Sequence, residues 1–299
     1  MLSIGFVGFG EAGSAIARGL RSAGVERIFA YDVKTGDPLI VNHARESQTT
    51  LVDSSSDLAE ASTILFSTVT SSSALDAAQE AVGYLSPRHT YADLNSVSPA
   101  LKQEIAKVIS ESGASFVEAA VMAPVEPYGH KVPILLGGPG AEAFAATMRP
   151  FGMRLEVLDG AKVGSAAAVK MCRSIVVKGL EALLLECVMA ATKFDADDLV
   201  SASLKETWPG VDWKKLADYT SGRVVLHGER RAREMDEVAE TLQSVGIDPI
   251  MAEATARRQD WSAELDLKSH FGPEGPKTYR EVVDLVNRLA ALNNARANH

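Results

Sequence analysis

Residues 3–13 read SIGFVGFGEAG, and this stretch decides the fold. Its first part, Ser3–Val7, is a short apolar run typical of a buried strand, and Glu11–Ala23 continues with helical spacing. The turn between them, Gly8–Gly13, fits the pattern G-x-G-x-x-G. That pattern is weak alone, but it gains physical meaning where a strand enters it and a helix leaves it.

Each glycine of the turn has an expected task. Gly8 makes the tight turn, Gly10 lets the backbone approach a pyrophosphate, and Gly13 lets the helix pack closely on the strand. Free N–H groups and the dipole at the helix start then hold the anion. Ligands of such sheets lie across the carboxyl ends of the strands. We therefore expect further cofactor contacts from Phe9, Glu11, Ala12, Thr68 and Val69.

Asp32 ends the second predicted strand, 32 − 13 = 19 residues after Gly13. An acidic residue at about this place accepts hydrogen bonds from the adenosine ribose and repels a 2′-phosphate. Asp32 therefore favours NAD over NADP as the cofactor. Lys34 and Arg45 are nearby positive charges that can serve a 2′-phosphate, so NADP stays possible.

Beyond the turn, short apolar runs alternate with helical stretches as far as about residue 160. This alternation predicts an α/β Rossmann domain, a doubly wound and mostly parallel sheet, over residues 1–160. The predicted strands are Ser3–Val7, Arg27–Tyr31, Thr63–Val69, Thr90–Leu94, Ser115–Ala120 and Val132–Leu136. The predicted helices are Glu11–Ala23, Ser73–Tyr84 and Pro99–Ser112.

Residues 161–299 show no clear strand signal, which predicts an all-α C-terminal domain. It opens with a long alanine-rich stretch, Val163–Thr192, that contains no proline, and Pro209 and Gly210 then break the pattern. Helical spacing returns at Ser221–Val245, Pro249–Leu265 and Tyr279–Leu292.

Composition excludes several classes of protein. The 299 residues are 46% apolar and carry a formal net charge of −9, so we expect neither general disorder nor a nucleic-acid partner. No run approaches a membrane span, and the default is a cytoplasmic protein without a membrane partner. The two cysteines, Cys172 and Cys187, form no metal motif and fit buried, reduced thiols.

The long predicted helix carries a candidate catalytic lysine, Lys170. Helical spacing places Ala166, Ala167, Arg173 and Ser174 beside it. Because three of these are small, Lys170 is expected to stand over a shallow trough that accepts a flat ring or a small substrate. Desolvation there and the charge of Arg173 would lower the lysine pKa toward a range useful for acid–base chemistry.

At this point the sequence resembles the β-hydroxyacid dehydrogenase family, which includes 3-hydroxyisobutyrate and 6-phosphogluconate dehydrogenases. Four segments occur in the family's order: Gly8–Gly13, Asp93–Pro99, Phe116–Pro124 running to Gly137-Gly138, and the lysine helix Gly164–Ser174. The resemblance implies that Asn95 lies beside the nicotinamide, that Lys170 is the general acid and base, and that Asn95 and Ser174 orient the substrate hydroxyl and the lysine.

The sequence departs from the family at the expected substrate anchors. Where the family has a serine and two glycines that bind the substrate carboxylate, this chain has Met122, Ala123 and Pro124. Arg173 and Ser174 replace the two asparagines after the lysine. These features resemble a divergent, phosphogluconate-dehydrogenase-like branch. Arg173 could supply a new anchor, because its planar fork suits a carboxylate or a phosphate.

Residues near 230 add further substrate candidates. Arg233-Glu234 corresponds to a lysine–aspartate pair of the family, counted back from Gly246. His227 and Arg231 share a helix face, and either could reach the substrate. The apolar stripe of Leu180, Leu183, Leu184, Cys187 and Val188 indicates a homodimer or larger homo-oligomer, as the family resemblance also implies.

These observations predict an NAD(P)-dependent oxidoreductase that acts on the CH–OH group of a small β-hydroxyacid. Two alternatives stay open. An imine-reductase-like enzyme shares the architecture but usually lacks the lysine, and a non-catalytic NAD(H)-binding protein would explain the altered anchors. The sequence does not reveal the substrate, or whether decarboxylation follows oxidation.

Overall fold

The computed structural model describes residues 2–297, with side chains through Leu292. The chain divides into two compact units, one ending at Lys170 and the other beginning at Met171. The first unit extends ten residues past the expected boundary at 160, because the start of the long helix packs on the sheet. Among the described residues, no helix is long and apolar enough to cross a membrane.

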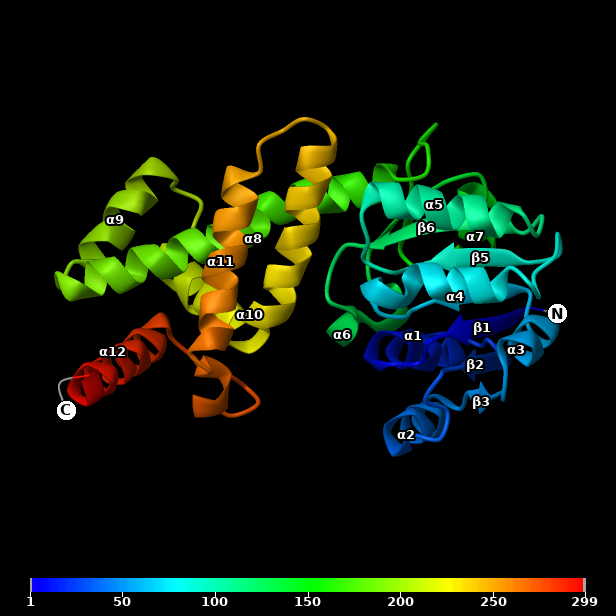
Figure 1. Ribbon diagram of the computed structural model, residues 1–299, viewed down its shortest axis with the longest axis horizontal. Coiled ribbons are helices and arrows are strands. Elements are labelled where there is room, and N and C mark those ends of the chain that lie inside the picture. The colour runs from blue at the N-terminus through cyan, green and yellow to red at the C-terminus, as the bar shows by residue number, and fades with distance from the viewer. Residues whose placement is uncertain (1, 298–299) are drawn as a thin grey trace. The chain divides into compact units, whose positions relative to one another are not determined.

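The first unit is built on one eight-stranded sheet with the order β3-β2-β1-β4-β5-β6-β7-β8. All neighbouring strands run parallel except β6 and β7, which are antiparallel (Figure 1). This order confirms the predicted mostly parallel, doubly wound sheet. The strands are β1 (Ser3–Val7), β2 (Arg27–Tyr31), β3 (Thr50–Leu51), β4 (Ile64–Ser67), β5 (Thr90–Asp93), β6 (Ser115–Val121), β7 (Ile134–Gly137) and β8 (Leu155–Val157).

Helices cover both faces of this sheet and bury two apolar cores. One core joins β1 to α1, α2 and α7 through residues such as Ile16, Ile40 and Phe144. The other joins the opposite face to α3, α4 and α5, for example through Leu58 and Ile105. The helices are α1 (Glu11–Ser22), α2 (Pro38–Ser47), α3 (Ser55–Ala61), α4 (Ala74–Ala81), α5 (Pro99–Ser110), α6 (Val125–Tyr128) and α7 (Ala141–Met148).

All six predicted strands and three predicted helices of this unit are present, with shifts of a few residues at their ends. The elements α2, β3, α3, α6, α7 and β8 were not predicted. Five of them have two to eight residues, which is few for a periodic pattern, whereas α2 has ten. Local caps set two of them instead, because Asp37 accepts the Leu39 N–H and Ser54 accepts the Asp57 N–H.

The second unit is helical throughout its described residues, as predicted. The helix α10 begins at Trp213, eight residues before the expected Ser221. Thr220, Ser221 and Gly222 are poor helix formers that hid its continuity, and Asp212 caps its start by accepting the Lys215 N–H. The helices are α8 (Ser165–Lys193), which begins in the first unit, α9 (Asp197–Thr207), α10 (Trp213–Ser244), α11 (Ile250–Glu264) and α12 (Tyr279–Ala297).

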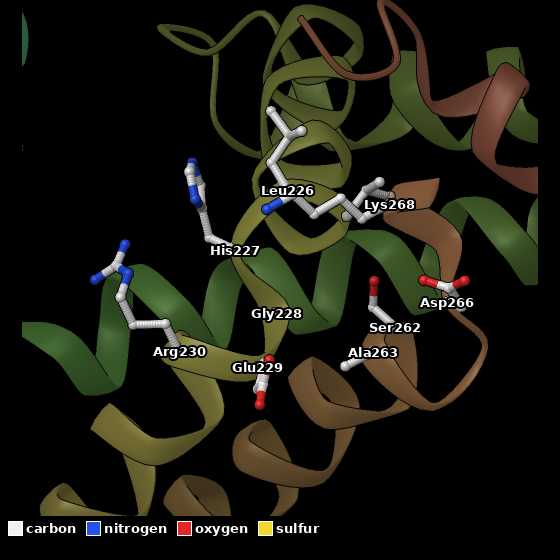
Figure 2. A pocket seen from close by; sticks show the side chains of 10 residues that line it. Leu226, His227, Gly228, Glu229, Arg230, Ser262, Ala263, Asp266 and Lys268 are labelled. Atoms are coloured by element: carbon white, nitrogen blue, oxygen red, sulfur yellow. The ribbon is translucent and has the colours of Figure 1, made fainter. Parts of the chain in front are cut away.

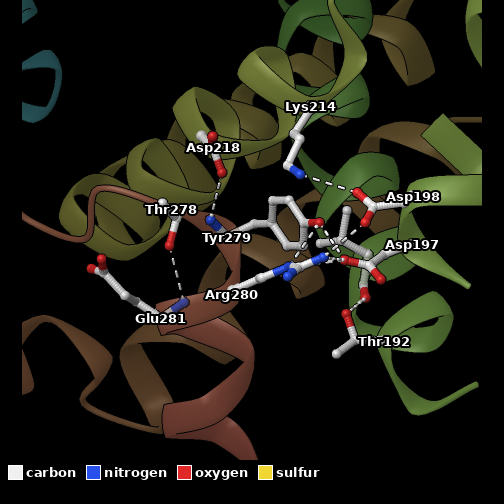
Figure 3. A network of polar contacts seen from close by, with 10 residues as sticks. Thr192, Asp197, Asp198, Lys214, Asp218, Thr278, Tyr279, Arg280 and Glu281 are labelled. Carbon is white, nitrogen blue, oxygen red and sulfur yellow. Dashed lines mark hydrogen bonds and ion pairs between the residues drawn. The ribbon is translucent and has the colours of Figure 1, made fainter. Parts of the chain in front are cut away.

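A polar network joins α9 and α12 of this unit (Figure 3). The Tyr279 hydroxyl donates to Asp197 Oδ2 at 2.5 Å, and Arg280 Nη2 donates to the same oxygen at 2.7 Å. From α10, Asp218 Oδ1 accepts the Tyr279 N–H at 2.9 Å. The hydroxyl donor and the guanidinium lower the pKa of Asp197, so this carboxylate stays ionised and holds the start of α12.

The cysteine prediction is wrong for one thiol. Cys172 is exposed, and Cys187 is only partly covered. Cys172 lies at helical spacing from Val169 and Val176, which are exposed as well, so this side of α8 is open in a way that helical spacing alone does not reveal.

A buried ion pair sits under the carboxyl edge of the sheet. Lys102 of α5 and Asp93 of β5 are both almost fully buried, with Lys102 Nζ 2.9 Å from Asp93 Oδ2. The same ammonium donates to the Asp93 carbonyl oxygen at 2.8 Å. A buried charge is tolerated only when it is paired and hydrogen-bonded, so the two residues depend on each other.

Replacing Lys102 with alanine should leave the Asp93 carboxylate buried without its counter-charge. We expect the free energy of unfolding to fall by about 3–5 kcal/mol, the usual cost of breaking a buried pair. Urea unfolding followed by circular dichroism measures the loss. Lys107→Ala removes an exposed lysine from the same helix and is the matched control. Equal stability of the two variants would contradict the importance of the pair.

Candidate functional site

The glycine turn has the geometry that the motif requires. Gly8 has φ +80°, and a Cβ there would lie 2.6 Å from Val69 Cγ1. A Cβ on Gly13 would lie 2.7 Å from Thr68 Oγ1, the hydroxyl that donates to the Gly8 carbonyl oxygen at 2.7 Å. A Cβ on Gly10 would meet nothing within 4 Å. Two glycines are thus required by packing, while Gly10 faces open space where a ligand can approach.

The start of α1 is available to an anion. No side chain caps its first turn, and the first intrahelical bond runs from the Ser14 N–H to the Gly10 carbonyl oxygen at 3.0 Å. The N–H groups before Ser14 therefore have no partner within the helix. Phe9 differs from the prediction, because its ring is buried in the core and its N–H is donated to Asp32.

Asp32 closes the turn from the end of β2. Its Oδ2 accepts the Phe9 N–H at 2.7 Å, and its Oδ1 accepts the Lys34 N–H at 2.9 Å. Each carboxylate oxygen has a second lone pair for a ribose hydroxyl. The carboxylate is therefore oriented before any ligand binds.

Asn95 follows β5 at the same edge of the sheet and is buried. Its Nδ2 donates to Asp93 Oδ1 at 2.6 Å and to Ser67 Oγ at 2.9 Å. Its Oδ1 is buried and has no hydrogen-bond partner among the described residues. A buried acceptor without a donor is costly, so this oxygen fits a donor supplied by a ligand.

Met122, Ala123 and Pro124 directly follow β6. Because β6 is parallel to β5, they lie at the same carboxyl edge as the glycine turn and Asn95. All three are at least partly exposed. The carboxyl edge of the sheet thus brings Met122, Ala123 and Pro124 together with the predicted cofactor residues. These three residues carry no hydroxyl, whereas the family has a serine in its substrate anchor.

A buried carboxylate fixes the start of α8. Glu118 of β6 accepts the Gly164 N–H at 2.7 Å through Oε2 and the Ala167 N–H at 2.7 Å through Oε1. A negative charge at a helix N-terminus is stabilised by the helix dipole as well as by the hydrogen bonds. Lys170, which is half-buried, lies three residues after Ala167. The sheet therefore sets where the lysine-bearing turn begins.

The expected trough beside Lys170 is absent on one side. Ala166 and Ala167 are both buried, and Ala166 packs against Ala120 and Leu135 of the sheet. Their small size serves close packing of helix on sheet, which spacing within one helix does not show. Ser174 is partly covered, and its hydroxyl accepts a hydrogen bond from Lys178 Nζ at 3.3 Å, while Arg173 is exposed.

Two predicted substrate contacts near residue 230 are engaged elsewhere. Arg231 is buried and forms a bidentate ion pair with Glu181, in which Arg231 Nε lies 2.8 Å from Glu181 Oε2. Arg233 is exposed, and Arg233 Nη2 lies 2.8 Å from Asp260 Oδ2. Both therefore stabilise the helical unit itself, in contrast to the expectation. His227 is half-buried on α10, where it borders a cavity of about 350 Å³ within the same unit (Figure 2).

The roles of Glu118 and Lys102 were not predicted from the sequence. Lys102 carried a usable signal, because it shares the buried stripe of its helix with Ile105 and Ile109 at helical spacing. Glu118 gave no local signal, since its partners are 46 and 49 residues away in sequence. No group of three or more potential metal ligands occurs among the described residues.

The sheet order, the glycine turn and Asp32 define a dinucleotide-binding protein with a Rossmann domain. Comparison with family models agrees. The NAD binding domain of 6-phosphogluconate dehydrogenase matches residues 3–150, and a domain of unknown function, DUF1932, matches residues 191–262.

Whole-chain comparisons give the family. An uncharacterised 28.5 kDa protein of Methanothermus fervidus is 33% identical over 257 residues, which cover 85% of this chain and 96% of that protein. A conserved protein described as structurally similar to 3-hydroxyacid dehydrogenases is 32% identical, with a TM-score of 0.74 over 89% of this chain and 99% of that one. Human mitochondrial 3-hydroxyisobutyrate dehydrogenase is 30% identical over 178 residues, 58% of this chain and 52% of that enzyme. The chain belongs to the 3-hydroxyacid dehydrogenase family, which confirms the resemblance.

NAD should bind more tightly than NADP, because we expect the oriented Asp32 carboxylate to face the ribose 2′-position. Two ribose hydrogen bonds and one charge repulsion correspond to ~1–3 kcal/mol. Calorimetric titration with both cofactors measures the difference. Asp32→Asn should narrow it, while Asp37→Asn, the same change five residues away, should leave it unchanged. A wild-type preference for NADP would overturn the assignment and point to Lys34 or Arg45.

Proposed function

We propose that this protein is an NAD(P)-dependent oxidoreductase that acts on the CH–OH group of a small β-hydroxyacid. One observation carries the proposal: the family's lysine helix is present, and a buried carboxylate, Glu118, holds its start against the sheet that carries the cofactor edge. A protein that only bound NAD would not need Lys170 in that helix.

The residues at the carboxyl edge fit the cofactor. Gly10 and the start of α1 would hold the pyrophosphate, and Asp32 would bind the ribose. The unpartnered Asn95 Oδ1 would accept a hydrogen bond from the nicotinamide end of the cofactor or from the substrate. When bound, NAD supplies the acceptor for the hydride.

Lys170 is assigned the proton chemistry. In oxidation, the neutral amine of Lys170 takes the proton of the substrate hydroxyl while the carbon that bears this hydroxyl loses its hydride to NAD. In reduction, the ammonium of Lys170 returns the proton to the hydroxyl oxygen. Asn95 is assigned to the substrate hydroxyl. Ser174, one turn further along α8, is assigned to orienting the lysine.

The altered substrate anchor also fits a second function, that of a non-catalytic NAD(H)-binding protein. Met122, Ala123 and Pro124 place no side-chain donor where the family binds the substrate carboxylate. This favours an unusual substrate, and it is also what a non-catalytic NAD(H)-binding protein would show. An imine-reductase-like activity is disfavoured by Lys170. Turnover of NAD with a panel of β-hydroxyacids distinguishes the three.

Lys170→Ala should remove turnover and spare cofactor binding. The glycine turn and Asp32 hold the cofactor independently of the lysine, and loss of a general acid–base group typically costs about 100-fold or more in rate. Initial rates and NAD titrations on the same preparations measure both effects. Lys170→Arg should not rescue the rate, because a guanidinium does not release its proton near neutral pH.

Lys162→Ala is the matched control, since Lys162 is exposed just before the same helix. It should keep near wild-type turnover. If Lys170→Ala retains more than about a tenth of the wild-type rate on its true substrate, Lys170 is not the acid–base group.

We further propose that a second copy of the chain covers the outer face of α8. Leu184 and Val188 of the predicted stripe are buried within their own unit, where Val188 packs against Tyr279 and Val283. Val176 and Leu183, seven residues apart, are 70% and 57% exposed. Heptad spacing of exposed apolar side chains is typical of helix–helix association.

Light scattering should therefore show a homodimer or larger assembly at micromolar concentration. Leu183→Glu places a charge in the proposed contact and should shift the assembly toward monomer. Leu39→Glu, the same change at an exposed leucine of α2, should leave it intact. A wild-type monomer would contradict the proposal.

A further inference from the structure

The side-chain amide of Asn95 has used both of its donors. Its Nδ2 donates to Asp93 Oδ1 at 2.6 Å and to Ser67 Oγ at 2.9 Å, and an amide nitrogen carries only two hydrogens. The backbone N–H of Asn95 also donates to Asp93 Oδ1, at 3.0 Å. The amide oxygen, Oδ1, is therefore the one group of this side chain that is left for a ligand.

Asp93 and Lys102 together prevent the amide from turning over. A hydroxyl such as that of Ser67 can donate or accept, so Ser67 alone would tolerate either orientation. The ammonium of Lys102 has only donors, and it donates to the Asp93 carbonyl oxygen at 2.8 Å and lies 2.9 Å from Asp93 Oδ2. Asp93 thus accepts from Lys102 on one side and from Asn95 on the other. Turning the amide over would bring Asn95 Oδ1 against a carboxylate oxygen, which is unfavourable because neither atom has a hydrogen to share.

The exposed end of the chain of hydrogen bonds is an acceptor without a donor. Asn95 is 5% exposed, and its Oδ1 has no hydrogen-bond partner among the described residues. Leaving a buried acceptor unpaired costs free energy, so a ligand group that supplies an N–H or O–H here gains affinity. A ligand group that can only accept gains nothing from this amide.

Two ligand groups carry a suitable hydrogen, the carboxamide of the nicotinamide and the hydroxyl of the substrate. The hydroxyl has one hydrogen, which the proposed mechanism transfers to Lys170, whereas a carboxamide has two. The sheet order β2-β1-β4-β5 puts the strand before Asn95 and the strand before Asp32 on opposite sides of the glycine turn. A dinucleotide spans the carboxyl ends with one nucleotide on each half of the sheet. With the adenosine at Asp32, the nicotinamide half falls on the side of Asn95.

We propose that Asn95 Oδ1 accepts a hydrogen bond from the carboxamide N–H of the nicotinamide, and that Asp93 and Lys102 are positioning residues that fix the amide for this donor. This inference rests on the proposed function. Between the cofactor and the substrate as partners of Asn95 Oδ1, it selects the cofactor, and it leaves the substrate hydroxyl to Lys170.

Calorimetric titration of the full-length protein with NAD and with its 3-acetylpyridine analogue tests the proposal. The analogue keeps the pyrophosphate, both riboses and the carbonyl oxygen, but a methyl group replaces the amide nitrogen, so it is equally charged and has no donor. The wild-type protein should bind NAD at least about tenfold more tightly, because the analogue leaves a buried acceptor unpaired.

Asp93→Asn combined with Lys102→Gln should abolish this discrimination. Both charges are removed together, so no buried charge is left unpaired, and two neutral amides no longer dictate the orientation of Asn95. Ser67→Ala is the matched variant, because it also removes a hydrogen bond to Asn95 Nδ2 but keeps Asp93. It should weaken NAD and the analogue equally and preserve their ratio. Lys107→Gln, at an exposed lysine of α5, should preserve the ratio as well.

If the double variant fails to fold, as judged by thermal unfolding, Asn95→Ala takes its place and should also bind the two cofactors with similar affinity. The proposal is overturned if the wild-type protein binds both equally, if the discrimination survives in Asn95→Ala, or if Ser67→Ala relaxes it as much as the double variant does. NAD binding without discrimination contradicts this inference alone. Discrimination without turnover of any β-hydroxyacid contradicts the proposed function alone, and a wild-type protein that does not bind NAD contradicts both.

Discussion

The buried carboxylate of Glu118 is the constraint on which the arrangement of the first unit depends. It stands in the middle of β6 without exposure to solvent, and its two oxygens accept the Gly164 and Ala167 N–H groups. Neutralisation by helix N–H groups is what makes an ionised side chain tolerable there. Gly137 on the neighbouring strand leaves it room, because a Cβ there would lie 2.7 Å from Glu118 Oε2. The helix that carries Lys170 therefore starts at a place set by the sheet.

The same register row organises the cofactor edge. Val7, Ser67, Asp93, Glu118 and Gly137 stand side by side across five strands. Ser67 and Asp93 accept hydrogen bonds from the side-chain amide of Asn95, and Lys102 forms an ion pair with Asp93. Buried groups thus fix the amide of Asn95, the polar group proposed to face a ligand. Such support reduces the reorganisation needed on binding.

The two units use charge differently. In the first, the buried charges are balanced, with Lys102 matched by Asp93 and Glu118 matched by helix N–H groups. In the helical unit, Arg231 and Lys178 form ion pairs with carboxylates, whereas Arg223 is influenced by the charge of Glu181 but forms no ion pair within the described residues. Burial disfavours the charged form of Arg223 and lowers its pKa.

Local pattern in the sequence was enough for the long elements and the glycine turn. The strand–turn–helix at Ser3–Ser22 follows from chain-local sterics, since only glycine fits Gly8 at φ +80°. Asp32 was predicted from its place at a strand end 19 residues after Gly13, and Asn95 from the family resemblance. The short elements and the true start of α10 were missed, because caps and packing override weak propensity there.

Tertiary structure alone decided the partners of charged side chains. Arg231 and Arg233 looked equally suited to a substrate in the sequence, yet one is buried against Glu181 and the other lies at the surface. The alanines beside Lys170 suggested a trough and instead pack on the sheet. Glu118 and Lys102 gained their roles from residues brought close only by folding. A sequence fixes which groups a chain carries, whereas their energies depend on burial and on neighbours far away along the chain, which only the folded structure specifies.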